Sequence, residues 1–270
     1  MPHHELLLVK WVNALFGPMV ASALGALGFH VTDPAKPIPD YLVMCAVVVL
    51  ALTALALAVR SRLSVEHPGK LQIVIEDVVS AVLDMMKTNI GPKGPQFFPL
   101  VGSVGLFIFT SNMIGKIPGL MSPTASINVT LGCAITVWVY YHFHGIKAQG
   151  LGKYLAHFAA PPGVPVFIAP IMLPIELISH FSRVLSLSLR LFGNIFGEEM
   201  VVAILASLIP FIAPLPMMVL GVITGTLQAF IFMLLTMIYL AGAVHTEHDH
   251  EHDHGAHEAD HGHAHAPATA

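Results

Sequence analysis

The sequence predicts an all-α integral membrane protein. Of its 270 residues, 55% are hydrophobic and only 10% are charged, and the apolar residues form continuous runs instead of alternating with polar ones. A run of about 20 apolar residues crosses a bilayer as one helix. We therefore expect about five transmembrane helices, one amphipathic helix on the cytoplasmic surface, and a long tilted helical hairpin at the C-terminal end.

Residues 1–40 are expected to form an N-terminal segment outside the membrane. The first 30 residues are apolar but are interrupted by Glu5, Lys10 and Pro18. We expect this stretch to lie at the membrane surface, with Trp11 as an interfacial anchor. A cleaved signal peptide is the alternative, because small residues cluster at positions 21–26. A linker containing three prolines leads to residue 40.

The membrane domain is predicted to extend over residues 41–244 and to begin with a span over residues 41–60. Arg60, Arg62 and Lys70 follow this span at once. By the positive-inside rule, its C-terminal end is cytoplasmic and the N-terminus is outside, in the periplasm. Residues 71–87 interleave charged and apolar side chains at helical spacing, which predicts the cytoplasmic surface helix.

The next spans are expected over residues 97–115 and 125–143, joined outside by the turn-rich KIPGLMSPT. Lys147 and Lys153 then fall on the inside, as alternation requires. No strong helix breaker follows Pro174 in residues 171–208, which predicts a helix of about 50 Å. A bilayer core is about 30 Å thick, so this helix must tilt. After the turn at residues 210–216, a last helix over residues 217–240 completes the hairpin.

Five polar residues of the long helix share one face, because steps of seven and four residues return to nearly the same side of a helix. They are Glu176, Arg183, Arg190, Asn194 and Glu198. Glu199 projects to the side opposite Arg190 by the same geometry. Its role therefore need not be that of Glu198.

Arg190 is the residue that most requires an explanation. A guanidinium at the centre of a membrane helix costs at least about 3 kcal/mol, and such residues generally mark a functional site. One interpretation is structural: a buried network with the pairs Glu176–Arg183 and Glu198–Arg190 fixes helix packing. The other is functional: Arg190 keeps its own proton and holds a moving carboxylate in its charged form. A proton path would then need titratable groups on both sides of Arg190.

Four stretches of the chain carry a resemblance to a known family. SLSLRLFGNIFGEE, TLQAFIFMLLTMIYL, PTASINVTLG and IELISHFSR resemble signature stretches of subunit a of the F-type ATP synthase, the stator subunit beside the rotating c-ring. The resemblance covers residues 68–240 and is most specific around Arg190 and Gln228. It implies a proton-translocating subunit in a bacterial inner membrane, with two offset half-channels that couple ion flow to rotation.

The resemblance also implies individual roles. Arg190 corresponds to the arginine that meets the c-ring carboxylate, Asn194 lies one turn further along, and Gln228 faces the arginine from the last helix. Glu199 corresponds to the titratable residue of the outer half-channel. Glu176, with the nearby Ser179, corresponds to the cytoplasmic half-channel.

Departures from the family pattern leave the relaying acid open between Glu198 and Glu199. The chain has Ser126 where the family often has Asp, Glu198 where a small residue is common, and Gly221 where some members have His. We expect Glu198 to compensate for a group that is missing elsewhere. Further candidate lining residues are Asn128, Thr130, His180 and Arg183.

The implied partners are the c-ring, the peripheral-stalk b subunits, the other ATP synthase subunits and the lipid bilayer, with no nucleic acid. We expect no cofactor and no enzymatic activity, because the chain has no GxxxxGK[ST] motif for nucleotide binding. Nucleotide chemistry would therefore belong to partner subunits. Sodium translocation by the same subunit is an alternative, since the ion-binding carboxylate would lie mainly on the c subunit.

Two interpretations from other classes are weaker. A self-contained secondary transporter, perhaps for a metal, would show internal repeats, and the Arg190 motif has no second copy. An intramembrane hydrolase would need a motif such as HExxH or GxSxG, and neither occurs.

Residues 245–270 form a His/Asp-rich tail that we expect to be disordered and cytoplasmic. It contains nine of the chain's 17 histidines, and such tracts can bind metals. Its weak candidate ligands are His248, His250, His252 and His254. Alternating His and Asp lacks the ordered spacing of a structural metal site, so we expect no fixed site there.

Overall fold

All regular secondary structure in the described part of the computed structural model is helical. Described are residues 7–26, 37–61, 63–64, 68–117, 119–150, 152, 154, 169–210 and 212–244, and these contain no strand. The predicted all-α membrane fold is thereby confirmed. The His-rich tail, with its candidate metal ligands, lies outside the described residues, as do Lys153 and most of the proline-rich linker.

The helices follow the predicted apolar runs. In chain order they are α1 (Leu7–Ala26), α2 (Asp40–Arg60), α3 (Lys70–Ile90), η1 (Gly94–Phe97), α4 (Phe98–Ile114), η2 (Pro123–Ala125), α5 (Ile127–Gln149), α7 (Ala169–Leu208) and α8 (Pro214–Val244). Helix α8 starts earlier than residue 217 because proline is well tolerated in the first turn of a helix. Helix α5 continues past residue 143 and ends at Gly150, whose φ of 81° favours glycine.

Four described helical segments are long and apolar enough to cross a membrane: α2, the segment Gly94–Ile114 with η1 and α4, α7 and α8. The predicted span over residues 125–143 is helical, as α5, but is not among these four. Its second half carries Tyr140, Tyr141, His142 and Lys147, which lower its hydropathy. A fifth crossing at α5 therefore stays a prediction.

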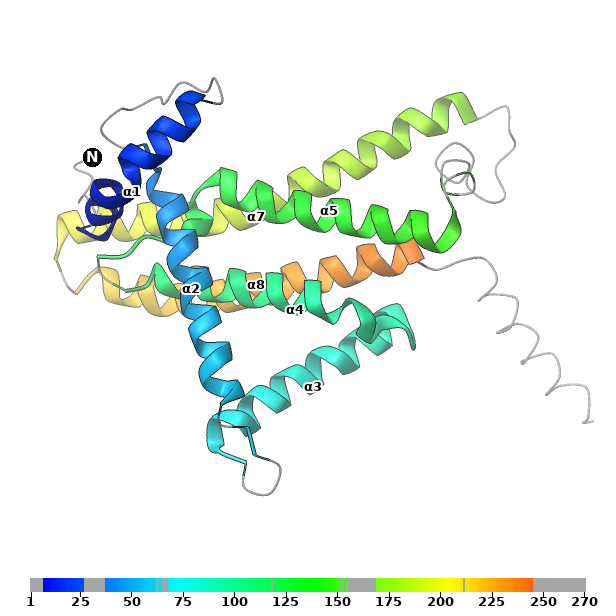
Figure 1. The fold of residues 1–270 in the computed structure, drawn as a ribbon, viewed down its shortest axis with the longest axis horizontal. Helices are drawn as coiled ribbons and strands as arrows, with labels where there is room; N and C mark the ends of the chain where they lie inside the picture. Colours follow the sequence, from blue (N-terminus) through cyan, green and yellow to red (C-terminus); the bar gives the residue numbers. More distant parts are fainter. Residues whose placement is uncertain are drawn as a thin grey trace, which may run out of the picture.

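Helices α7 and α8 form the C-terminal hairpin. They run side by side near the connection between them, α5 packs against both, and α4 packs against α8. In Figure 1, α2 runs across the direction of these four helices. With 40 residues, α7 is about 60 Å long at 1.5 Å per residue, twice the thickness of a bilayer core. This length agrees with the predicted tilt of the hairpin.

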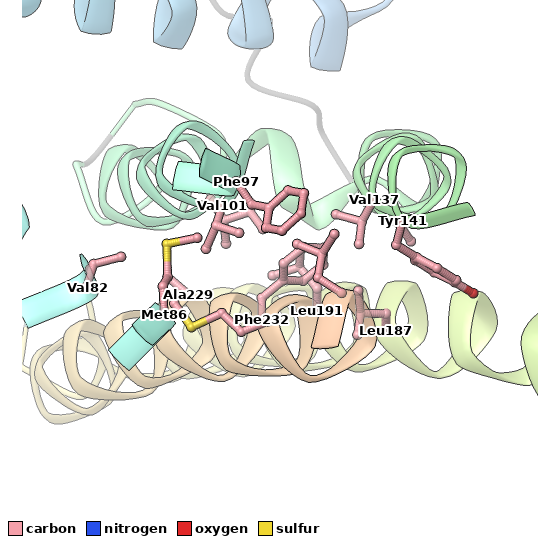
Figure 2. Close-up of a cluster of buried hydrophobic side chains, with 14 of the residues drawn as sticks. Val82, Met86, Phe97, Val101, Val137, Tyr141, Leu187, Leu191, Ala229 and Phe232 are labelled. Atoms are coloured by element: carbon pink, nitrogen blue, oxygen red, sulfur yellow. The ribbon is translucent and has the colours of Figure 1, made fainter. Parts of the chain in front are cut away.

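The packed interior lies between α3, α4, α5, α7 and α8 (Figure 2). Leu191 and Phe232, which are almost fully buried, bring α7 and α8 into this cluster. Gly105 allows α4 to approach α8 closely, because a Cβ at this position would collide with the side chain of Met233. Small residues at such crossings are the usual device of membrane helices, where lipid supplies no hydrophobic driving force for association.

One buried side chain joins three elements of this interior. Asn112 of α4 is fully buried, and its Nδ2 donates a hydrogen bond of 2.9 Å to the carbonyl oxygen of Gly225 in α8. Its Oδ1 accepts a hydrogen bond of 2.7 Å from the Thr124 hydroxyl in η2. Asn112 thus fixes both α8 and the connection to α5 against α4.

We predict that Asn112→Leu lowers the free energy of unfolding by about 1–2 kcal/mol, because it leaves the Gly225 carbonyl and the Thr124 hydroxyl without this partner. Denaturant titration of the detergent-solubilised protein measures this loss. Asn89→Leu is the matched control, since the Asn89 amide donates only within its own helix, to Met85. Equal stabilities of the two variants would contradict the interpretation.

Candidate functional site

Helix α7 places polar side chains at three levels along its length. Glu176 and His180 lie near its N-terminal end, Arg190 and Asn194 lie in the middle, and the Glu198–Glu199 pair lies towards its C-terminal end. At 1.5 Å per residue, Arg190 is about 21 Å along the axis from Glu176 and about 12 Å from Glu198. The two outer levels are therefore separated by about the thickness of a bilayer core.

Near the start of α7, His180 contacts Glu176, Tyr141 and His142, and we call these four residues the His180 cluster. The His180 Nε2 atom lies 3.2 Å from Oε1 of Glu176. Its Nδ1 atom lies 2.8 Å from the Tyr141 hydroxyl of α5. The rings of His142 and His180 meet edge to face at 4.9 Å between centroids. Because both ring nitrogens of His180 have partners, this histidine links the half-exposed Glu176 to the interior.

Arg183 does not form the pair with Glu176 that one interpretation of the sequence predicted. Residues seven apart are about 10 Å apart along the axis, whereas the fourth residue is a neighbour on the helix surface, so Glu176 pairs with His180. The Arg183 guanidinium instead lies over the ring of Tyr239 in α8, with its carbon 5.4 Å from the ring centroid, in a cation–π contact. Ser179 is half-buried beside this group.

The opposite level of α7 is centred on Glu198. Its Oε1 atom forms an ion pair with Lys116, which lies between α4 and η2. Its carboxylate lies against the bare backbone of Gly221 in α8, where a Cβ atom would collide with it. The predicted Glu198–Arg190 pair is not formed, because eight residues of helix separate the two charges. We call Lys116, Glu198 and Gly221 the Glu198 cluster.

Glu199 has a different partner. Its Oε1 accepts a hydrogen bond of 3.1 Å from the backbone N–H of Ser122. The Ser122 hydroxyl lies 2.7 Å from that of Thr124, which in turn donates to Asn112. Glu198 and Glu199 therefore both contact the connection between α4 and η2, although they leave α7 in different directions.

Arg190 is exposed in the middle of α7. The exposed side of α7 around it also carries Ser186 and Gly193, while Leu189 and Phe196, at 51% and 43% relative exposure, lie further round the helix. Among the described residues, nothing forms an ion pair or a hydrogen bond with its guanidinium. An arginine without a partner in a mainly apolar membrane helix generally marks a functional site.

Asn194 and Gln228, the other candidate residues near Arg190, differ in how far they are buried. Asn194 is half-buried, and Gln228 of α8 is buried with a relative exposure of 6%. The implied pairing of Gln228 with Arg190 is not present as a hydrogen bond between these described side chains. The structure thus places the two residues on adjacent helices without joining them.

The candidate lining residues at the start of α5 lie apart from these hydrogen bonds. Asn128 is exposed, and Ser126 is the half-buried residue that precedes the helix. Thr130 is buried and donates its hydroxyl hydrogen bond, at 3.1 Å, to the Ile127 carbonyl of its own helix. None of the three is hydrogen-bonded through its side chain to Glu198 or Glu199 within the described ranges.

Sequence reasoning missed Lys116, Ser122 and the contact of Tyr141 with His180. In the sequence, Lys116 is part of the turn-rich KIPGLMSPT, and Tyr141 lies in the predicted span over residues 125–143, far from His180. A usable signal existed for Lys116: it is the only charged residue between Lys93 and Lys147. No group of three or more His, Cys, Asp or Glu side chains that could hold a metal ion occurs in the described part of the chain.

Comparisons with known proteins identify relatives over most of the chain. The family model described as the ATP synthase A chain matches residues 41–241. ATP synthase subunit a of Helicobacter pylori is 53% identical over 182 residues, which cover 67% of this chain and 79% of that protein. The subunit a of Geotalea daltonii is 41% identical over 245 residues, which cover 91% and 99%. That of Campylobacter jejuni is 49% identical over 201 residues, which cover 73% and 88%.

We predict that Gly221→Ala costs about 1–3 kcal/mol of stability, because the new methyl group would push the Glu198 carboxylate away from α8 and disturb its ion pair with Lys116. Gly242→Ala is the control on the same helix. A Cβ at residue 242 meets nothing within 4 Å, and alanine favours a helix over glycine. Denaturant titration compares the two, and an equally neutral Gly221→Ala would mean that Glu198 does not occupy this space.

Proposed function

The chain belongs to the ATP synthase subunit a family, a component of the membrane-embedded Fo sector, and on this premise we propose that it conducts protons past a c-ring. In this proposal two offset half-channels lead to the ring from opposite sides of a bacterial inner membrane. Proton flow through them drives rotation of the ring. The chain itself carries out no nucleotide chemistry, which belongs to the other ATP synthase subunits.

The observation that carries the proposal is the position of Arg190. It is exposed in the middle of a long, mainly apolar helix, between a titratable group near one end of α7 and another towards the opposite end. A guanidinium keeps its proton at any physiological pH, so a proton cannot pass through Arg190 itself. A carboxylate on a moving partner would release its proton on meeting this charge.

In this proposal, the polar residues near the two ends of α7 supply the two half-channels. Glu199, with the Ser122 and Thr124 hydroxyls behind it, serves the outer one. Glu176 and His180 serve the cytoplasmic one, with Ser179 beside them. Arg190 separates the two, so that a proton can cross only by riding on the ring.

The membrane potential supplies the driving force, worth about 2.3 kcal/mol per charge per 100 mV. We propose that the N-terminus lies in the periplasm and the C-terminus in the cytoplasm, as Arg60 at the end of α2 and Lys70 after it favour. Besides the c-ring, peripheral-stalk b subunits would hold this subunit in place against the torque of rotation.

We predict that Arg190→Ala abolishes ATP-driven proton pumping by the assembled complex in vesicles and opens a passive proton leak through the Fo sector. The reason is that the fixed positive charge between the half-channels is lost. Arg60→Ala is the matched control, because Arg60 is an exposed arginine at the end of α2. Pumping that persists in Arg190→Ala at matched assembly would contradict the proposal.

The choice of ion is tested in the same vesicles. If protons are the transported ion, pumping is expected to proceed at an unchanged rate in medium from which sodium has been removed. A strict requirement for sodium would assign sodium translocation to this chain instead.

We further predict that Tyr141→Phe slows pumping several-fold, because it removes the hydroxyl that lies against Nδ1 of His180 and so frees the ring beside Glu176. Tyr140→Phe is the control: the ring of Tyr140 lies at a tilt against that of His144, with 4.2 Å between the centroids, and no described residue forms a hydrogen bond with its hydroxyl. Equal pumping rates of the two variants would exclude Tyr141 from the cytoplasmic half-channel.

A further inference from the structure

The ion pair between Lys116 and Glu198 is largely shielded from solvent. The exposed fraction of the side chain is 12% for Lys116 and 8% for Glu198. The two residues come from distant parts of the sequence, one from the connection after α4 and one from α7. A surface ion pair contributes little because water screens it, but removing one partner of a buried pair is costly because it leaves an uncompensated charge.

Glu198 depends on Lys116 for this compensation. Its second carboxylate oxygen, Oε2, is buried and has no hydrogen-bond partner, and the nearest part of α8 is the bare backbone of Gly221. Lys116 is therefore the one described side chain that balances the Glu198 charge. A carboxylate in this position cannot lose its cation without a large free-energy penalty.

Glu199 is held differently, although it is the next residue. Its partner is the neutral backbone N–H of Ser122, and no ion pair involves it in the described part of the chain. A backbone N–H can donate to a carboxyl oxygen whether or not the group carries a proton. Glu199 can therefore exchange a proton without leaving an opposite charge unbalanced.

We infer that Lys116 is a positioning residue that fixes Glu198 as a permanent ion pair, so that Glu199 alone relays the ion at this end of α7. This inference rests on the proposed function and deepens it, because it assigns different roles to two adjacent acids. Glu198 then acts as a fixed charge that ties α7 to the α4–η2 connection beside Gly221, and Lys116 acts through Glu198 without touching the transported ion.

The test is a double-mutant cycle of ATP-driven proton pumping in vesicles, with the whole complex at matched assembly. Lys116→Met is expected to slow pumping about tenfold or more, since Glu198 is left unpaired. Glu198→Gln is expected to slow it as well, since Lys116 is left unpaired. The double variant Lys116→Met/Glu198→Gln is expected to regain most of the lost rate, because neither charge remains. Lys116→Arg, which keeps the charge, is expected to pump faster than Lys116→Met.

Two controls accompany the cycle. Lys87→Met breaks an exposed lysine–carboxylate pair with Asp84 on α3 and is expected to leave pumping unchanged. Glu199→Gln is expected to abolish pumping in the wild-type and in the double-variant background alike, as required of a relay.

Three outcomes would overturn the inference. One is a double variant as slow as Lys116→Met, which would make Glu198 itself a relay. Another is a Lys116→Met variant that pumps like the wild type. The third is a double variant that keeps pumping after Glu199→Gln. The proposed function is tested separately, by Arg190→Ala. If pumping requires Arg190 but the double variant does not regain its rate, only the role of Lys116 is refuted.

Discussion

The charge of Arg190 is the constraint on which the rest of this structure depends. A guanidinium that is exposed on a mainly apolar membrane helix, without a partner among the described residues, is costly in a bilayer. Helix α7 can present it because α5 and α8 pack along the opposite side, where Leu191 and Ile195 are fully buried. The hairpin thus holds Arg190, which has no partner among the described residues, on the side of α7 that faces away from the buried Leu191 and Ile195.

The other charged groups of α7 have partners within the chain. Glu198 pairs with Lys116, Glu176 pairs with His180, and Arg183 lies over the Tyr239 ring. This contrast separates two uses of charge in a membrane helix. The Glu198–Lys116 and Arg183–Tyr239 contacts join α7 to the α4–η2 connection and to α8, whereas Arg190 has no counter-charge among the described residues. We regard the difference in pairing, rather than the number of charges, as the mark of the functional residue.

The sequence alone predicted the helices and singled out Arg190, because both signals are local: apolar runs have the length of a membrane crossing, and an arginine inside such a run is conspicuous. It did not predict which charges pair, since Lys116 meets Glu198 across 82 positions of sequence and Tyr141 meets His180 across 39. Helical periodicity placed Glu176 and Arg183 on one face, but side chains seven residues apart do not reach one another, whereas His180 is four residues away. The predicted crossing over residues 125–143 is helical but is not among the four candidate spans, because polar aromatic residues lower the hydropathy of the second half of α5.

The most direct measurement of the central claim is the structure of the assembled Fo sector in a lipid bilayer, read at the guanidinium of Arg190. Our account predicts a carboxylate from a neighbouring ring subunit within about 4–6 Å of this group, the range over which opposite charges govern protonation, with Glu198 still paired to Lys116. An Arg190 side chain paired with an acid of its own chain, or turned towards lipid headgroups with no partner carboxylate beside it, would contradict the account.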